Sequence, residues 1–284
     1  MHLDVQTKFT LGTHITDEQH AFYQKYGFVI FKSAYSMEEV QKIRDGIVEA
    51  TETITAQGRE FINGVPVKYG MNNQGKILPQ RTPFMNLLNT KVNEMVSHPR
   101  LKPLLEFIPG SRFGLQERDG VVINHYIAGA KSKFKKLGWH TDSIRDLFYF
   151  EKVRPMLNVG LHIYPSSLEQ GGLRIIPGTH KGGLLSLFFR RGYIFDNAPD
   201  PQELIVSVEP GDVTIHDGRM WHRAAGPTVA VKGERKSLYF PILCGPVRKK
   251  SSESSVPFYL RFMSGLKPPK PETQEAMSNV NRSA

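Results

Sequence analysis

Cysteine is almost absent from this 284-residue chain, and long apolar runs are missing altogether. Cys244 is the single cysteine, so no disulfide can form within the chain; this fits a reducing compartment and predicts a cytoplasmic location. No stretch approaches the roughly 18 apolar residues that cross a bilayer. The first residues also lack the basic and apolar segments of a secretory leader. We therefore expect a soluble protein with no membrane partner.

Acidic residues are outnumbered by basic ones, which gives a net charge of +10. The lysines and arginines are scattered, with denser clusters only at residues 131–136, 190–191 and 248–250. No DNA- or RNA-binding motif accompanies them, so we expect no nucleic-acid partner. Two interpretations of the charge remain, a solvated basic face and an anionic substrate.

The order of local patterns predicts a mainly β fold with flanking helices. Residues 16–57 read as helix, strand and helix, residues 58–80 as polar, glycine-rich turns, and residues 84–110 as further helices. Strand-like runs then follow at short intervals, at 121–126, 156–164, 173–176, 205–208, 213–216 and 237–243. Such spacing is typical of an antiparallel sandwich or barrel.

We expect these segments to form one domain covering residues 1–284. Its β core would span about residues 115–247, supported by N-terminal helices at about residues 16–110. Residues 267–284 are rich in polar residues and proline and are expected to form a loose tail.

Two short segments carry the residue types of a metal site. His140 and Asp142 are two positions apart, so on a strand they would face the same side, although a His-x-Asp triplet alone is weak evidence. His222 follows 82 residues after His140, at an expected strand end. Two imidazoles and one carboxylate bind one face of a divalent first-row metal and leave the opposite positions open, as an oxygen-activating iron site requires.

A third segment offers a receptor for a carboxylate. Arg235 and Ser237 share one face of an expected strand 13 residues beyond His222, and a guanidinium beside a hydroxyl binds a carboxylate well. The far carboxylate of 2-oxoglutarate would suit this position. Asn124, and Tyr126 with it, precede the metal motif on a neighbouring strand and are further candidates for contact with that co-substrate.

Together these segments resemble the phytanoyl-CoA dioxygenase family across residues 16–245. The resemblance rests on Phe-Tyr-Gln-Lys-Tyr-Gly-Phe-Val-Ile at 22–30, Trp-His-Thr-Asp at 139–142, Gly-Gly-Leu-Arg-Ile-Ile-Pro-Gly-Thr-His at 171–180, Pro-Gly-Asp at 210–212, Trp-His-Arg at 221–223 and Gly-Glu-Arg-Lys-Ser at 233–237. It implies a double-stranded β-helix of the jelly-roll, cupin-like type. It also implies iron held by His140, Asp142 and His222, and 2-oxoglutarate held by Arg235.

The same resemblance implies a reaction. Fe(II), 2-oxoglutarate and O₂ would generate an Fe(IV)-oxo species that removes a hydrogen atom from a small organic substrate, with release of succinate and CO₂. Halogenating relatives replace the carboxylate ligand with a small residue, and Asp142 is present. We therefore expect a dioxygenase that hydroxylates, desaturates or cyclises its substrate.

Two other classes of function remain as alternatives. One is a non-catalytic barrel that binds metal and ligand as a sensor or scaffold; the other is a zinc hydrolase, which has no use for Arg235. Residues 127–137 and 181–201 are candidates for the substrate mouth, or else only cover the edge of the core. We expect His180 to be structural and Arg223 to point away from the site.

Overall fold

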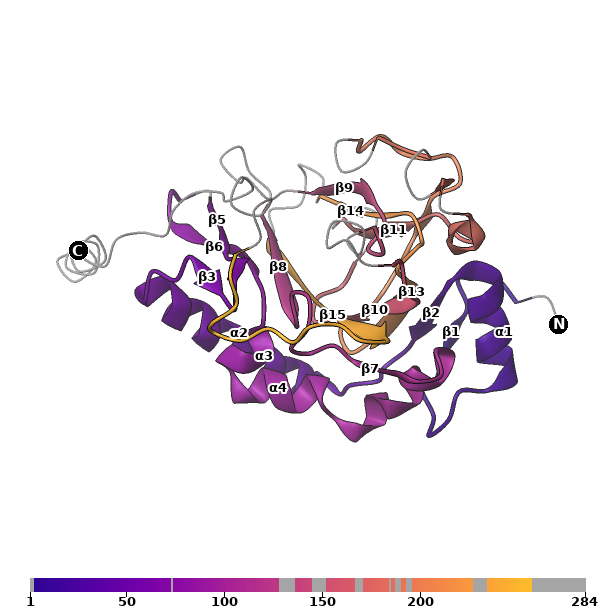
Figure 1. Cartoon of the computed structure of the whole chain (residues 1–284), viewed down its shortest axis with the longest axis horizontal. Coiled ribbons are helices and arrows are strands. Elements are labelled where there is room, and N and C mark those ends of the chain that lie inside the picture. The colour runs from indigo at the N-terminus through magenta and orange to yellow at the C-terminus, as the bar shows by residue number, and fades with distance from the viewer. Residues whose placement is uncertain are drawn as a thin grey trace.

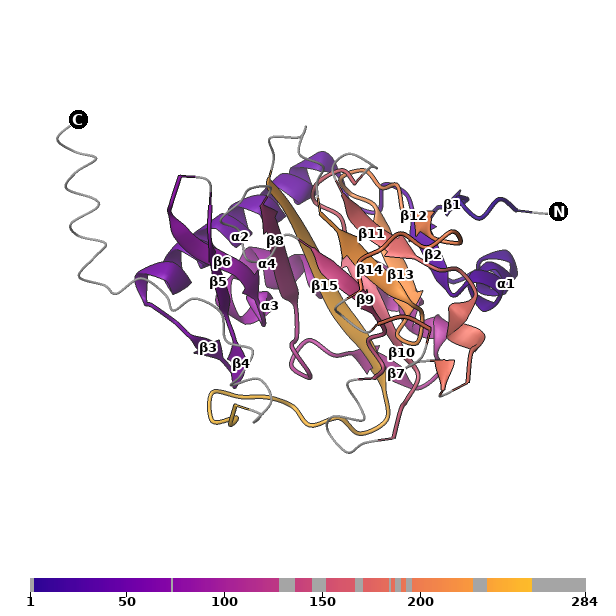
Figure 2. The ribbon, with the colours of Figure 1, turned by 90° about the horizontal axis from the view of Figure 1, so that it is seen from above.

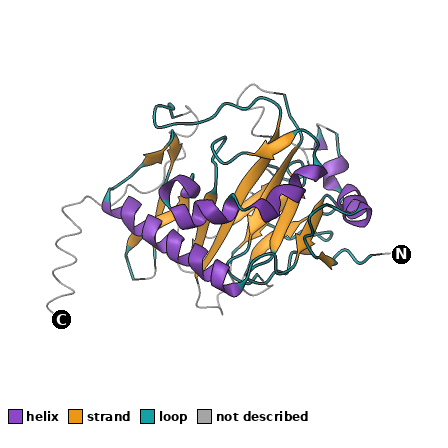
Figure 3. Cartoon of the chain, turned by 90° about the horizontal axis from the view of Figure 1, so that it is seen from below, coloured by secondary structure: helices purple, strands orange, loops and turns teal. Residues whose placement is uncertain are grey.

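The computed structural model describes residues 3–72, 74–127, 136–144, 152–166, 171–183, 185–186, 190–192, 196–226 and 234–256. The expected tail at 267–284 lies outside these ranges. Two β-sheets face each other, and helices cover the free face of the larger sheet (Figures 1 and 3). Within the described part of the chain, no helix combines the length and the apolar character that a bilayer crossing requires.

The larger sheet contains nine strands. In spatial order they are β1 (Lys8–Phe9), β2 (Phe28–Phe31), β13 (Val213–Asp217), β10 (Met156–Leu161), β15 (Glu234–Cys244), β8 (Val122–Ile127), β6 (Ile77–Thr82) and β5 (Lys68–Met71), and β7 (Ser111–Phe113) pairs with β15. The smaller sheet has the order β12 (Leu204–Ile205), β11 (Gly172–Ile175), β14 (His222–Ala225) and β9 (Leu137–His140). A separate hairpin joins β3 (Phe61–Ile62) and β4 (Val65–Pro66).

The strands from β8 to β15 alternate between the two sheets, except at the step from β11 to β12. Their pairings are antiparallel throughout. This is the connectivity of a double-stranded β-helix, so the predicted fold class is confirmed. Figure 2 shows β9, β14 and β11 lying across the strands of the larger sheet.

Strand alternation divides the larger sheet into an apolar and a polar face. On β10, Leu157, Val159 and Leu161 belong to the core on the helix side, and Asn158 and His162 alternate with them. The same alternation runs through β13 and β15, because side chains two positions apart share a face. The face that the larger sheet turns toward the smaller sheet is therefore largely polar.

The helices are α1 (Asp17–Tyr26), α2 (Met37–Ala56), α3 (Met85–Leu88), α4 (Thr90–Val96), and the 3-10 helices η1 (Pro99–Phe107) and η2 (Thr179–Lys181). Capping boxes define the starts of α1 and α2: Thr16 pairs with Gln19, and Ser36 with Glu39. The buried stripe of α2, from Val40 through Ile43 and Ile47 to Ile54, packs on the core. The helices predicted over residues 16–57 and 84–110 are thus present.

One expectation for the N-terminal half was wrong. Residues 58–80 were expected to form turns, but β5 and β6 lie there and extend the larger sheet beyond β8. The alternation that marks a strand is interrupted by a register shift between Lys68 and Tyr69, and β6 contains Pro79. Pairing with β8 stabilises these strands, although their own sequence hardly indicates them.

Gly27 fixes the end of α1, and its replacement should be costly. It has a left-handed backbone (φ 80°), and an added Cβ would overlap the ring of His180 and the methyl group of Met220. For Gly27→Ala we expect a loss of about 2–4 kcal/mol in the free energy of unfolding, from backbone strain plus overpacking. Denaturant titration measures this loss. Gly110→Ala is the matched control, because φ is 76° there and nothing lies within 4 Å of the added Cβ. Equal losses in the two variants would contradict the role of the His180 contact.

Candidate metal and co-substrate site

His140, Asp142 and His222 meet at one end of the barrel interior. His140 ends β9 and lies directly opposite His222, the first residue of β14, and their ring centroids are 4.1 Å apart. Asp142 follows just after β9 rather than on it, and its Oδ2 lies 3.6 Å from His222 Nε2. One ligand atom from each residue lies within 4.8 Å of the others. The structure thus brings the three predicted residues together.

Hydrogen bonds orient both imidazoles toward the shared space. His140 Nδ1 lies 2.7 Å from the carbonyl oxygen of Gly138, and His222 Nδ1 lies 2.9 Å from that of Met220. A carbonyl only accepts, so each Nδ1 carries the proton and each Nε2 carries the lone pair that can bind a metal. Asn158 Nδ2 donates to Asp142 Oδ2 at 2.9 Å and orients the carboxylate in the same way.

The electrostatic surroundings keep His222 in its ligating form. Burial holds the pKa of His222 well below its usual value, and the neighbouring His140 lowers it further, while Asp142 opposes the shift. A neutral imidazole is the form that binds a metal. The donor set of two imidazole nitrogens and one carboxylate oxygen therefore fits a non-haem iron(II) ion.

Arg235 lies in the same interior with an unsatisfied guanidinium. The residue is 8% exposed, and within the described structure its Nε and Nη2 have no hydrogen-bond partner. Its Cζ lies 4.5 Å from the centroid of the Tyr126 ring, which stabilises the charge but accepts no strong hydrogen bond. A buried guanidinium with unpaired donors fits the distal carboxylate of 2-oxoglutarate.

Strand register places the other predicted co-substrate residues around Arg235. Tyr126 lies opposite Arg235, and Asn124 lies opposite Ser237, so all four side chains share the interior face of β8 and β15. Asn124 Oδ1 is buried and has no partner among the described residues. The sequence-based grouping of Arg235, Ser237 and Asn124 therefore matches one continuous patch.

Tyr239 connects this patch to the metal-ligand end. Burial raises the pKa of the Tyr239 hydroxyl, the Arg235 guanidinium opposes this rise, and Tyr126 and Asp142 add to it. Tyr239 follows Ser237 on the same face of β15, and its ring centroid lies 6.3 Å from that of His216, which is next to Asp142. The arrangement can hold a metal and, next to it, a molecule with a terminal carboxylate.

The sequence did not single out His216 as part of the site. The structure places its ring 4.6 Å from that of His222, with Nε2 3.7 Å from Asp142 Oδ2. It is 1% exposed, and neither ring nitrogen has a hydrogen-bond partner within the described ranges. The alternation of β13, with Val213 and Ile215 facing the helices, could have indicated that His216 faces the interior.

His162 lies further along the interior and should make folding sensitive to acid. Burial lowers its pKa to about 3, and its Nε2 lies 2.9 Å from the Thr214 hydroxyl. The unfolded chain therefore binds a proton near pH 6.5 that the folded chain excludes, so this part of the stability is complete above pH 6.5 and is lost as the pH falls toward 3. Between pH 7.5 and pH 5 we expect the wild type to lose about 2 kcal/mol more than His162→Gln, measured by denaturant titration at each pH. Parallel pH curves for the two proteins would contradict this assignment.

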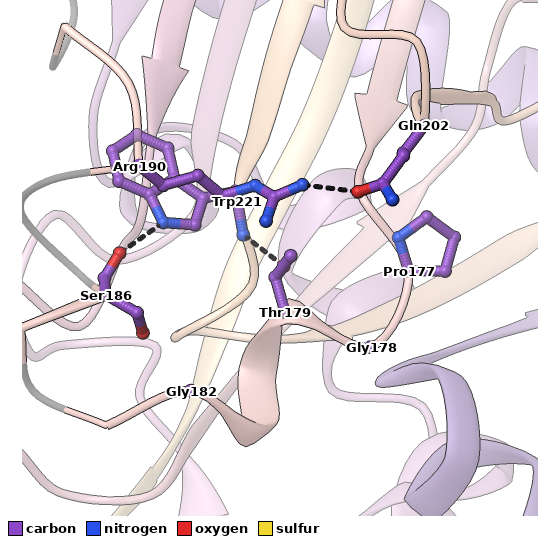
Figure 4. A pocket seen from close by; sticks show the side chains of 8 residues that line it. All are labelled: Pro177, Gly178, Thr179, Gly182, Ser186, Arg190, Gln202 and Trp221. Atoms are coloured by element: carbon purple, nitrogen blue, oxygen red, sulfur yellow. Dashed lines mark hydrogen bonds between the residues drawn. The ribbon is translucent and has the colours of Figure 1, made fainter.

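The face of the smaller sheet opposite the metal ligands is covered by part of residues 181–201. Trp139 Nε1 donates to Ala198 O at 2.8 Å, and Trp221 Nε1 donates to Ser186 O at 2.7 Å (Figure 4). Arg223 points to this face, as predicted, and pairs with Glu203 at 2.8 Å. The described part of this expected substrate mouth thus lies on the far side of β14 from the His222 imidazole.

Two further expectations concern the segment 127–137 and His180. Residues 128–135 of segment 127–137 lie outside the described residues. His180 is buried in η2, where its ring centroid lies 6.1 Å from that of Tyr23 in α1. This position agrees with the structural role expected for it.

Comparison with known proteins agrees with the geometry. Residues 23–228 match the model of the family described as "Phytanoyl-CoA dioxygenase (PhyH)". A curated relative, "Dioxygenase andF" from Emericella variicolor, is 21% identical over 212 residues; the match covers 71% of this chain and 65% of that protein. The chain therefore spans about two thirds of that relative's length.

Solved structures share the fold at low sequence identity. The carbocyclase SnoK from nogalamycin biosynthesis, described as non-heme and alpha ketoglutarate dependent, superposes with a TM-score of 0.60 at 16% identity, covering 92% of this chain and 96% of SnoK. AviO1 from Streptomyces viridochromogenes Tue57 gives a TM-score of 0.58 at 13% identity, covering 85% and 99%. The family model matches residues 23–228, well over half of the chain, and by this match the chain belongs to the phytanoyl-CoA dioxygenase family.

Proposed function

We propose that this protein is an Fe(II)/2-oxoglutarate-dependent dioxygenase that hydroxylates a small organic substrate. One observation carries the proposal: three metal-type ligands with oriented lone pairs share a polar interior with a buried guanidinium that has unpaired donors. A site with both features can hold a metal and a keto acid at once. Family membership supports the same assignment.

In this proposal His140, Asp142 and His222 hold the iron, and Arg235 binds the distal carboxylate of 2-oxoglutarate, with Ser237 and Asn124 beside it. Bound iron and 2-oxoglutarate supply the oxidative decarboxylation that activates O₂ and releases succinate and CO₂. Asn158 holds the Asp142 carboxylate by its hydrogen bond at 2.9 Å. The burial of Asp142, His222 and Arg235 excludes bulk water and strengthens these charge interactions.

The presence of Asp142 bears on the reaction outcome. In the proposed site the Asp142 carboxylate takes the coordination position that a halide would need. We therefore propose oxygen transfer rather than halogenation. The neighbour named as a carbocyclase makes ring closure, which removes hydrogen without inserting oxygen, an outcome to compare with hydroxylation.

Anaerobic reconstitution with Fe(II) and 2-oxoglutarate, followed by O₂ and a library of small metabolites, tests the proposal. We expect succinate in a substrate-dependent amount, and a product heavier by one oxygen atom. A product lighter by two hydrogens would instead assign desaturation or ring closure.

Two results would reject the proposed activity. Metal and 2-oxoglutarate binding without succinate from any substrate would favour a sensor or scaffold. Hydrolysis in the absence of O₂ and 2-oxoglutarate, supported by zinc, would favour a hydrolase.

A further inference from the structure

The β5–β6 hairpin, which the sequence did not predict, continues the polar interior face outward from β8 (Figure 2). Lys68 on β5 lies opposite Arg81 on β6, Arg81 lies opposite Asn124 on β8, and Asn124 lies opposite Ser237 on β15. Directly opposed residues in an antiparallel sheet share a face. These four side chains thus form one transverse row that begins at the hairpin and ends beside the proposed co-substrate anchor.

Positive charge exceeds negative charge along this row. Arg81 Nη2 lies 2.7 Å from Asp119 Oδ2, and both side chains are largely buried. Lys68 also interacts with Asp119, but the nearby Arg81 repels it. Arg235 is close enough that it and Arg81 both act on the Tyr126 hydroxyl. Lys68, Arg81 and Arg235 thus lie in or beside this row, and among the described contacts Asp119 is the carboxylate that offsets the charges of Lys68 and Arg81.

The charge on Lys68 is only partly compensated by Asp119. Burial and Arg81 lower the pKa of Lys68 to about 8, against an ordinary value of 10.5, although Asp119 opposes this shift. If these residues served only to stabilise the fold, the Arg81–Asp119 ion pair would be sufficient. A neutral side chain at residue 68 would then avoid the free-energy cost of burying a charge. The excess charge therefore indicates a ligand that neutralises it.

We propose that Lys68 and Arg81 bind a negatively charged group of the substrate, a carboxylate or a sulfate- or phosphate-type oxyanion. This inference rests on the proposed function, in which Arg235 is taken by 2-oxoglutarate. The substrate is then an anionic small molecule whose charged end lies at the β5–β6 hairpin and whose remainder extends toward the metal ligands.

The test measures binding of inorganic sulfate, and separately of acetate, to the full-length protein loaded with Mn(II) and saturated with 2-oxoglutarate. Sulfate keeps its charge from pH 7 to pH 9, so calorimetric titration at both values isolates the protein's own ionisation. We expect Lys68→Met to weaken binding of the preferred anion about tenfold or more. Lys68→Arg should retain the anion affinity of the wild type. Lys76→Met is the control, because Lys76 is exposed on the same hairpin, and it should leave the anion affinity unchanged.

The pH arm gives a second readout. Arg81 from β6 and Asp119 from the loop before β8 are the charged groups that face Lys68. Because the pKa of Lys68 is lowered to about 8, anion affinity should fall from pH 7 to pH 9 in the wild type and stay constant in Lys68→Arg. A preference for sulfate or for acetate identifies the kind of anionic group.

Three outcomes would overturn the proposal: no binding of either anion to the wild type, equal binding to Lys68→Met, or equal loss in Lys76→Met. Loss of 2-oxoglutarate binding in Lys68→Met, with unchanged thermal unfolding, would assign the pair to the co-substrate instead. Failure of the proposed function is distinguishable, because it appears as absent 2-oxoglutarate binding in the wild type.

Discussion

Replacement of His222 by alanine is expected to abolish metal binding and to reduce succinate formation by at least about a thousandfold, because a metal-dependent step is lost with its ligand. The imidazole is 5% exposed, and its Nε2 faces Asp142 at 3.6 Å. Mn(II) affinity, followed by electron paramagnetic resonance, measures the binding loss directly. Thermal unfolding of the metal-free variant shows whether the fold is retained.

His14→Ala is the control for this experiment, since that histidine is largely exposed and pairs only with Glu106 at 3.2 Å. It should leave both Mn(II) affinity and turnover unchanged. Normal Mn(II) affinity in His222→Ala would remove this residue from the ligand set, and with it the proposed iron site.

Replacement of Arg235 by methionine should raise the Michaelis constant for 2-oxoglutarate about 100-fold, because a buried carboxylate would lose its charged hydrogen-bond partner. Mn(II) affinity should remain within a factor of about two, since the residue is not a ligand. Titration of 2-oxoglutarate against the Mn(II)-loaded protein checks the effect without turnover. Arg235→Lys should recover part of the affinity, because it restores the charge but not the paired donors.

Arg223→Met provides the matched control. Arg223 and Arg235 are both 8% exposed, but Arg223 pairs with Glu203 on the opposite face of β14. Its loss should lower stability and leave 2-oxoglutarate affinity unchanged. Equal losses of co-substrate affinity in the two variants would show that the Arg235 effect arises from general loosening of the sheet.

The metal and co-substrate residues could be predicted from sequence because their chemistry and their strand alternation agree. His140 and Asp142 are close in sequence, and Arg235 and Ser237 share a face on any strand that contains them. The convergence of the metal ligands could not be read locally, since it depends on the pairing of His140 with His222 within the smaller sheet, across 82 residues. The family resemblance supplied that long-range information.

Other parts of the site lacked a local signal. His216 has the same residue type as many structural histidines, and its position beside Asp142 follows only from the pairing of β13 with β10. Lys68 and Arg81 lie in strands whose alternation is broken by a bulge and a proline. Their contribution depends on register with β8, which the sequence of the hairpin does not reveal.

Each histidine ligand directly follows a tryptophan, and each indole N–H is held by a carbonyl of the covering segment, at Ala198 for Trp139 and at Ser186 for Trp221 (Figure 4). A tryptophan and the histidine after it project to opposite sides of the strand, so the two carbonyls brace the ligand strands from behind. A shift of the backbone at Ser186 or Ala198 would therefore be transmitted to the direction of the imidazole next to the bound indole. The side chains at these two positions can diversify, but the positions of their carbonyls are tied to the geometry of the metal ligands.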